Sequence, residues 1–371
     1  MSHQHTILLF AVDPGGANSI GILAHELSKT ANIVCFAKEA ACSHLKHNFP
    51  QINVTLLTNK HDQYSKTTYL QLLATIKPNV VFTDTTGRDY SNRSLWRACK
   101  DFGIPSIAIL DQWMNYALRF LKQHETYQGC IAYTTDDFIL PTAIVTMDCS
   151  AKLQMIKEGL PENIIHPLGS PYYESFKSKP VKNKTQKKKA ITILFASEPI
   201  TAVYGHKLGK KIHGYTEQTI IKTLCQSIAK QAKQQHFSVI IRPHPRESQQ
   251  RYNRLIKSYH FASLCSKRSV QESIQSADIV LGMSSTMLLE ASLQNKPILS
   301  IQIGNHKESP FYLEQIGLLR SVRYTFQLHN VINNLEAMRF NRYRVKMMTQ
   351  NNSVESIHKL MISLCQLGKS D

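Results

Sequence analysis

The chain has 371 residues, about twice the usual length of a single domain, so we expect two domains. Its 42% hydrophobic and 19% charged residues exclude collagen-like, disordered and disulfide-scaffold proteins. Forty-four Lys and Arg against 26 Asp and Glu give a net charge of +18, which favours an anionic partner such as a nucleotide, an acidic polymer, a nucleic acid or an acidic membrane surface.

The sequence shows neither a membrane span nor a secretory signal. Its apolar runs are far shorter than the roughly 20 residues that cross a bilayer, and no Lys or Arg precedes the first of them. The eight cysteines are scattered without a C-x-x-C pair, so we expect reduced thiols and no metal site. We therefore expect a cytoplasmic protein, with peripheral contact at the inner membrane face left open.

Short apolar runs alternate with amphipathic stretches through the first half of the chain. The predicted strands are Thr6–Asp13, Asn32–Ala37, Asn53–Leu57, Asn79–Thr83, Pro105–Leu110 and Ile144–Asp148. The predicted helices between and after them are Ser19–Ser28, Tyr69–Ile76, Ser94–Phe102 and Ser150–Glu158. Strands separated by helices of this length predict a parallel sheet covered by helices on both faces.

A basic segment then separates two similar halves. Lys177–Lys189 contains seven lysines and almost no apolar residue, so it predicts a solvated linker between a domain at 1–176 and a domain at 190–371 that ends in helices. The predicted strands of the second domain are Ala190–Ala196, Phe237–Arg242, Ala277–Gly282 and Pro297–Gln302; its predicted helices are Glu217–Gln234, Gln249–Ser258 and Thr286–Gln294. The fold class is therefore α/β, with two Rossmann-like doubly wound domains expected to face a cleft.

The first candidate site follows the strand that ends at Arg242. Pro243 and Pro245 hold His244 in an extended loop, and Arg242 and Arg246 flank it. Imidazole and guanidinium donors this close together suit a phosphate. The alternative is a strand-ending turn whose histidine is merely exposed.

The second candidate is the helix start at Ser284, Ser285 and Thr286. Small hydroxyl residues that open a helix offer O–H and N–H donors and the positive end of the helix dipole to an anion. Glu290, further along the same helix, suits a diol such as a ribose. The alternative is simple N-capping of the helix.

Carboxylates follow the strands of the first half. Asp13, followed by Gly15, Gly16 and Asn18, is a candidate general base beside a loop that lets a ligand approach the backbone. An Asx-type turn explains Asp13 equally well. Asp84 ends a later strand in the same way and is a second candidate base.

Two further strand ends carry candidate residues. Asp111 and Trp113 end the strand Pro105–Leu110, and the indole could either stack against an acceptor sugar or fill space between the domains. Ser197 and Glu198 end the first strand of the second half and are candidate donor-binding residues.

The layout resembles the GT-B fold of nucleotide-sugar-dependent glycosyltransferases. The resemblance is carried by the two halves, by the passage Lys152–Pro171 that leads to the second half, and by the His244-Pro245 motif followed by Ser284-Ser285. Within that fold these motifs are similar to those of bacterial transferases that use cytidine nucleotides, namely sialyltransferase-like, Kdo-transferase-like and CDP-glycerol transferase-like enzymes. The resemblance implies that His244 and the serines contact the donor phosphate, that Glu290 contacts the ribose, and that a carboxylate of the first half, such as Asp13, deprotonates the acceptor. By the same resemblance the second half is the nucleotide-donor domain and the first half is the acceptor-side domain, where the expected acceptor-side residues are Gly15, Gly16, Asn18, Asp111 and Trp113.

The main hypothesis is an inverting, metal-independent glycosyltransferase of bacterial surface polysaccharide synthesis. It moves a sugar from a nucleotide-sugar to a glycan or lipid-linked acceptor, and the resemblance implies that the donor is CMP-activated. The nucleotide-sugar is a substrate, and no cofactor is expected. Alternatives on the same scaffold are a UDP-GlcNAc 2-epimerase-like enzyme and a CDP-glycerol-type polyol-phosphate transferase. A nucleic-acid-binding protein is disfavoured because no helix-turn-helix, RRM or zinc-finger pattern is found.

Overall fold

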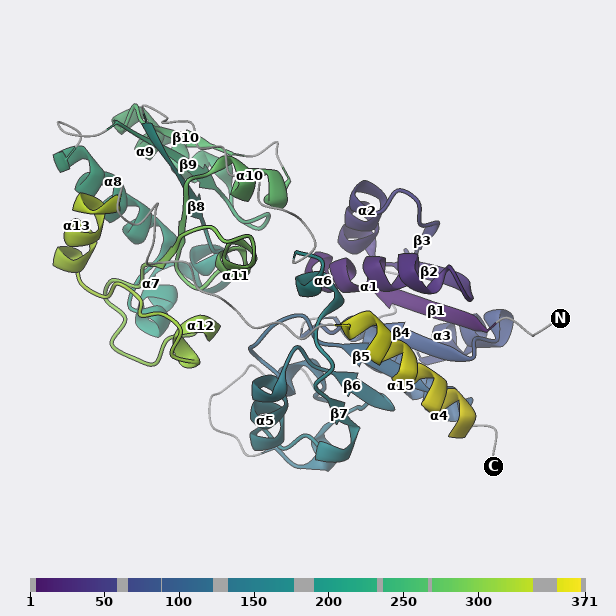
Figure 1. Ribbon diagram of the computed structural model, residues 1–371. Coiled ribbons are helices and arrows are strands. Elements are labelled where there is room, and N and C mark those ends of the chain that lie inside the picture. Colours follow the sequence, from purple (N-terminus) through teal and green to yellow (C-terminus); the bar gives the residue numbers. More distant parts are fainter. Residues whose placement is uncertain are drawn as a thin grey trace. The chain divides into compact units, whose positions relative to one another are not determined.

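The computed structural model describes residues 5–58, 66–87, 89–122, 133–176, 190–231, 236–265, 269–335 and 352–367. The chain divides into two compact units: Met1–Ser178 with Thr349–Asp371, and Lys179–Met348. Each unit contains one parallel sheet with its own covering helices (Figure 1), which confirms the predicted α/β class. The predicted linker at 177–189 lies outside the described residues.

The sheet of the first unit has seven strands in the order β3-β2-β1-β4-β5-β6-β7. Their bounds are β1 Thr6–Ala11, β2 Asn32–Ala37, β3 Val54–Leu56, β4 Val80–Thr83, β5 Ser106–Ile109, β6 Ala143–Val145 and β7 Ile165–His166. The direction of strand order reverses between β1 and β4, because the chain leaves the edge at β3 and returns beside β1. Polar residues that follow β1 and β4 therefore come together at one point of the sheet edge.

Alternate residues of each strand enter two separate cores. Ile7 and Leu9 of β1 pack with the helices on one face, and Leu8 and Phe10 pack with those on the other. The first face is covered by α1 Pro14–Leu27, α2 Glu39–Asn48 and α15 Ser353–Leu367, and the second by α3 Lys66–Ile76 and α4 Ser91–Asp101. Two shorter helices complete the unit, α5 Cys149–Lys157 and α6 Pro171–Glu174.

The C-terminal helix corrects the predicted domain assignment. We expected everything from residue 190 onward to form the second domain, but α15 packs on the first (Figure 1). Ile357 and Met361 are buried in the core that contains Ile20 and Leu23 of α1. The physical reason is that α15 carries an apolar stripe, and the core beside α1 is the one that this stripe completes.

The sheet of the second unit has five strands in the order β10-β9-β8-β11-β12. Their bounds are β8 Ala190–Ala196, β9 His236–Arg242, β10 Ala262–Leu264, β11 Ile279–Gly282 and β12 Ile298–Ser300. The helices are α7 Ile200–His213, α8 Glu217–Gln231, α9 Asn253–Ser258, α10 Val270–Ser276, α11 Thr286–Leu293, α12 Tyr312–Gln315 and α13 Thr325–Asn333. As in the first unit, the direction of strand order reverses between the central strand, β8, and its neighbour β11.

Two general features bear on function. No helix in the described part of the chain is both long and apolar enough to cross a membrane. Nor do the described residues contain a group of three or more His, Cys, Asp or Glu side chains that could hold a metal ion.

Candidate functional site

The candidate donor site of the second unit lies where β9, β8 and β11 end. Ala196 of β8 pairs with Arg242 of β9 on one side and with Gly282 of β11 on the other. Because these three residues form one row across the sheet, the loops that follow them leave the same edge. The carboxyl edge of an open parallel sheet, beside the reversal of strand order, is where such folds bind ligands.

The loop after β9 holds His244 in a defined orientation. The backbone N–H of His244 donates to Glu247 Oε2 at 2.6 Å, and the N–H of Arg246 donates to His244 Nδ1 at 3.1 Å. Since Nδ1 accepts a hydrogen bond, the proton of the neutral ring lies on Nε2. In this tautomer His244 carries an N–H donor at Nε2, and a phosphate can accept such a bond.

The two arginines that flank His244 differ in exposure. The Arg242 guanidinium donates to Ser273 Oγ on α10 at 2.9 Å, whereas Arg246, like Pro245, is exposed. Arg242 thus contacts α10, and Arg246 is an exposed cation of the loop.

A carboxylate that the sequence analysis missed connects this loop to the end of β8. Glu247 is buried and accepts hydrogen bonds from Ser197 Oγ at 3.0 Å and from the Tyr252 hydroxyl at 2.6 Å. Burial raises the pKa of Glu247 despite these bonds. Ser197 therefore positions the His244 loop, and its hydroxyl is engaged inside the protein.

The loop after β11 is held by Glu198. Ser284 donates its backbone N–H to Glu198 Oε1 and its hydroxyl to Oε2, the latter at 2.8 Å. Burial raises the pKa of Glu198 to about 7, although the bonds from Ser284 oppose that shift. Glu198, predicted only as a loop residue that binds the donor, thus occupies the donors of Ser284.

The start of α11 follows directly. Ser285 is the N-cap residue, and its hydroxyl oxygen accepts the N–H of Met287 at 3.3 Å. Thr286 is the first helical residue, and both side chains are only partly buried. Glu290, one turn further along, is 7% exposed, so only a small part of its side chain is open to a ligand.

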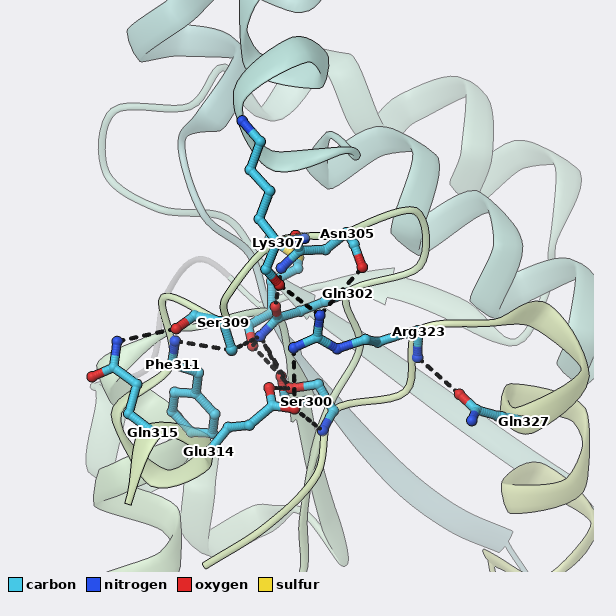
Figure 2. A network of polar contacts seen from close by, with 12 residues as sticks. Ser300, Gln302, Asn305, Lys307, Ser309, Phe311, Glu314, Gln315, Arg323 and Gln327 are labelled. Carbon is cyan, nitrogen blue, oxygen red and sulfur yellow. Dashed lines mark hydrogen bonds and ion pairs between the residues drawn. The ribbon is translucent and has the colours of Figure 1, made fainter. Parts of the chain in front are cut away.

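A buried polar network supports this loop from the side of β12 (Figure 2). Ser300 Oγ donates to the backbone carbonyl of Met283 at 2.5 Å. Gln302 Nε2 donates to Ser309 Oγ at 2.7 Å, and Asn305 Nδ2 donates to Gln302 Oε1 at 2.9 Å. Because Met283 immediately precedes Ser284, the network fixes the backbone that leads into α11.

In the first unit, Asp84 joins the ends of β4 and β1. Its Oδ2 accepts the backbone N–H groups of Val12 and Asp13, each at 2.9 Å, and its Oδ1 accepts Asn92 Nδ2 at 2.9 Å. Burial, with the nearby charge of Asp13, raises the pKa of Asp84 to about 7. Asp84 is fully buried, so it positions the Asp13 loop and does not meet an acceptor.

The glycines of the same loop make room for carboxylates. A methyl group on Gly16 would lie 2.3 Å from Cβ of Asp84, and one on Gly15 would lie 2.8 Å from Oδ2 of Asp111. Asp111 is itself buried and paired with Arg119 at 2.9 Å, and burial raises its pKa although Arg119 opposes the shift. These two predicted acceptor-side glycines therefore bring the start of α1 against Asp84 and Asp111.

Asp13 is the carboxylate that remains available. It is half-buried at the start of α1, and among the described residues no hydrogen bond reaches its side chain from the helix it precedes. Asn18 lies one turn along α1, where its amide donates to Gly15 O at 3.2 Å and its oxygen contacts His44 Nε2 at 2.8 Å. Asn18 thus stabilises the loop.

Trp113 is held inside the first unit. Its indole N–H donates to Asp148 Oδ2 at 2.7 Å, its ring lies 5.1 Å from that of Tyr173, and only 5% of it is exposed. The indole of Trp113 therefore packs within the first unit and offers little open surface on which a sugar could stack.

One cavity of the first unit lies elsewhere. It has a volume of about 330 Å³ and includes His25, Ser28 and Asn32 in its lining. Asn32 begins β2, so the cavity lies at the amino edge of the sheet, opposite the loop of Asp13.

Comparison with known proteins identifies the fold. No protein-family model and no curated protein sequence matches the chain. Among solved structures, the UDP-GlcNAc 2-epimerase of Neisseria meningitidis bound to UDP-GlcNAc is similar over 96% of this chain and 100% of its own, with a TM-score of 0.64 and 15% identity. The S. aureus MnaA-UDP structure covers 97% and 98%, with a TM-score of 0.68 and 13% identity.

A glycosyltransferase has the same architecture. The lipopolysaccharide outer core galactosyltransferase WaaB in its apo form covers 96% of this chain and 99% of its own, with a TM-score of 0.54 and 14% identity. The chain therefore has the GT-B-like fold that glycosyltransferases and these epimerases share. This confirms the predicted fold.

Proposed function

We propose that this protein is a nucleotide-sugar-dependent glycosyltransferase whose second unit binds the donor. The observation that carries the proposal is that hydrogen bonds connect the ends of β9, β8 and β11, where the strand order reverses. Glu247 connects the loop of His244 to Ser197 at the end of β8. Glu198, the next residue, is hydrogen-bonded to Ser284 after β11. Fixed donors gathered at this edge suit the phosphate of a nucleotide.

The donor phosphate is assigned to His244, Arg246 and the start of α11. The Nε2–H of His244 and the N-terminal end of α11 at Ser285 and Thr286 are oriented before the ligand arrives, so little free energy is lost in arranging them. They would stabilise the negative charge that develops on the departing nucleotide. Because fixed cations and dipoles can perform this neutralisation, the proposed mechanism is metal-independent.

Asp13 is assigned the role of general base. Removal of a proton from an acceptor hydroxyl requires a carboxylate that a substrate can reach, and the sequence analysis left Asp13 and Asp84 as candidates. Asp84 is fully buried and has hydrogen bonds on both oxygens, whereas Asp13 is half-buried. Attack by the deprotonated hydroxyl on the anomeric carbon would invert its configuration.

A glycan or lipid-linked acceptor fits the charge of the chain. The surplus of 18 positive charges favours an acidic glycan, or an acceptor at the anionic inner face of a membrane, over a neutral acceptor. A role in bacterial surface polysaccharide synthesis is consistent with the WaaB structure, whose name states an outer core lipopolysaccharide activity. A cytidine nucleotide is the first donor to test, on the His244 and Ser284 motifs.

A thermal-shift panel with CMP, CDP, UDP, GDP and ADP tests donor binding, because a ligand that binds only the folded state raises the Tm. Transfer of a labelled sugar from the nucleotide that binds then tests the reaction. We expect His244→Ala to lower kcat about 10²- to 10³-fold, the usual cost of losing one fixed charge-stabilising donor. His260→Ala, an exposed histidine of the same unit, is the control and should change nothing. An unchanged rate in His244→Ala would contradict the proposed site.

An epimerase is the second candidate, favoured by the higher TM-scores of the UDP-GlcNAc 2-epimerase and MnaA-UDP structures. Incubation with UDP-GlcNAc alone separates the two activities, since an epimerase needs no acceptor. A new epimer without acceptor would replace the transferase proposal. Release of glycerol phosphate from CDP-glycerol to an acceptor would instead establish the polyol-phosphate alternative.

A further inference from the structure

Glu198 places its carboxylate at a group of donors just ahead of α11. Its two oxygens accept the N–H and the hydroxyl of Ser284, and the N–H of Met283 also stabilises its charged form. Successive backbone N–H groups just ahead of a helix N-terminus form an anion-binding concavity. The anion at this position is the protein's own carboxylate.

The same donors belong to the region assigned above to the nucleotide phosphate. A carboxylate and a phosphate cannot share them, because each is negative and each needs the same N–H and O–H groups. We therefore propose that Glu198 competes with the donor phosphate, and that its carboxylate leaves Ser284 before a nucleotide binds there. This inference rests on the proposed function, and it adds a residue that sets donor affinity.

Tyr215 is the residue that can receive the displaced carboxylate. It is 1% exposed, and its hydroxyl has no hydrogen-bond partner among the described residues. Burial raises the pKa of Tyr215 most, and the charge of Glu198 is the next largest cause, so the side chains of Tyr215 and Glu198 are close. Gly214, just before Tyr215, has φ +82°, and a Cβ there would lie 2.0 Å from the carbonyl oxygen of Gly304, so the backbone at this point lies against that residue. A fixed, unpaired O–H beside Glu198 offers it a second position.

The competition depends on pH. The charged or titratable groups that act on Glu198 and Tyr215 are Glu247, Arg323 and Glu314. Because the pKa of Glu198 is raised to about 7, the carboxylate is mostly neutral at pH 6 and mostly charged at pH 8. If only the neutral form of Glu198 releases the donors of Ser284 to the ligand, nucleotide affinity falls about tenfold from pH 6 to pH 8.

Calorimetric titration of the full chain with CMP and with CDP, at pH 6, 7 and 8, tests the proposal. Glu198→Gln keeps the size of the side chain but removes the charge, so we expect it to bind about tenfold more tightly than the wild type at pH 8. Because the ligand phosphate also titrates, the pH dependence is read as the ratio of wild type to Glu198→Gln. That ratio should approach one at pH 6. Glu198→Ala is a second variant with the same expected direction.

The chain provides a matched control in Asp137. Its carboxylate accepts the N–H and the hydroxyl of Thr134, as Glu198 does with Ser284, but it lies in the first unit. Asp137→Asn should leave nucleotide affinity unchanged. An equal gain in this variant would show a general effect of charge and would overturn the specific role of Glu198.

Tyr215→Phe tests the second position. Because the Tyr215 hydroxyl is unpaired without ligand, its removal should not lower the Tm. The change should nevertheless weaken nucleotide binding about three- to tenfold in the wild type, and it should leave binding by Glu198→Gln unchanged. Equal weakening in both backgrounds would exclude Tyr215 as the receiving group. Unchanged or weaker binding in Glu198→Gln and Glu198→Ala would overturn the competition itself. If neither the wild type nor any variant binds a nucleotide at any pH, the proposed donor site fails.

Discussion

Asp13 and Asp84 show how position within a strand-end loop decides what a carboxylate can do. Asp84 accepts three hydrogen bonds inside the first unit, and Asp13 is half-buried at the start of α1. Sequence alone could not separate them, because both follow an apolar strand and precede small residues. The separation comes from the loop geometry, which turns the N–H of Asp13 toward Asp84.

Asp84→Asn should remove a pH dependence of stability. The pKa of Asp84 in the folded protein is about 7, above its ordinary value of 3.8, so the charged carboxylate is disfavoured by folding. The wild type should therefore lose stability relative to the variant as the pH rises from about 4 to about 7, by a difference in Tm of about 3 °C or more, with no further loss above that range. Thermal scans of both proteins across this range give the measurement. The exposed Asp101, changed to Asn, is the control; a constant difference in Tm between Asp84→Asn and the wild type would contradict the raised pKa.

Gly16→Ala should destabilise the first unit. The added methyl group would lie 2.3 Å from Cβ of Asp84, so α1 or the end of β4 must shift. Overpacking of this kind costs about 1–3 kcal/mol in the free energy of unfolding. Urea denaturation of the variant, beside His25→Ala on the exposed side of the same helix, gives the comparison. Equal stability of the two variants would show that the loop is not tightly packed.

At the scale of elements, the strands were the most predictable part of the chain. The apolar runs behind β1, β4, β8, β9 and β11 predict buried parallel strands, and the candidate residues fall where those strands end. The prediction failed at helix ends: α1 begins at Pro14 and not at Ser19, because proline fits the first turn of a helix. The hydrogen-bonded pair of Glu247 and Tyr252 could not be predicted, because it depends on a loop conformation that no local sequence pattern indicates.

The helix α7 shows a second limit. Gly205, at φ +73°, interrupts it, and most of its second half is exposed lysines and apolar residues, so no buried stripe marks it in the sequence. Likewise, the apolar stripe of α15 predicts a helix but does not indicate which core the helix completes. Contacts between distant segments decide that.

Glu174→Ala should loosen α15. The carboxylate of Glu174 accepts the N–H groups of Asn352 and Ser353, at 2.5 and 2.8 Å, and the hydroxyl of Ser353, so it caps a helix far along the chain. Loss of such a cap lowers the free energy of unfolding by about 1–2 kcal/mol. Hydrogen exchange in residues 353–367 should rise. Glu162→Ala, at a mostly exposed carboxylate of the same unit, is the control, and unchanged exchange in α15 would refute the capping role.

At the scale of the whole molecule, each unit has its own core, so a ligand of one unit should stabilise that unit selectively. A nucleotide held at 100 times its Kd stabilises the fold that binds it by about 2.7 kcal/mol. We therefore expect calorimetry to resolve a later transition for the second unit when nucleotide is present. Hydrogen exchange should slow at 197–199, 242–247 and 282–290. Protection confined to the first unit would place the nucleotide elsewhere.

The return of α15 to the first unit also orders the events of synthesis. Ile357 and Met361 belong to a core whose other members are translated before the entire second unit. The first unit therefore stays incomplete until the last helix has been made, whereas the described strands and helices of the second unit precede that helix in the chain. A chain truncated before residue 352 should thus contain a protease-resistant second unit beside a cleavable first one, and chaperones should bind the open core next to α1.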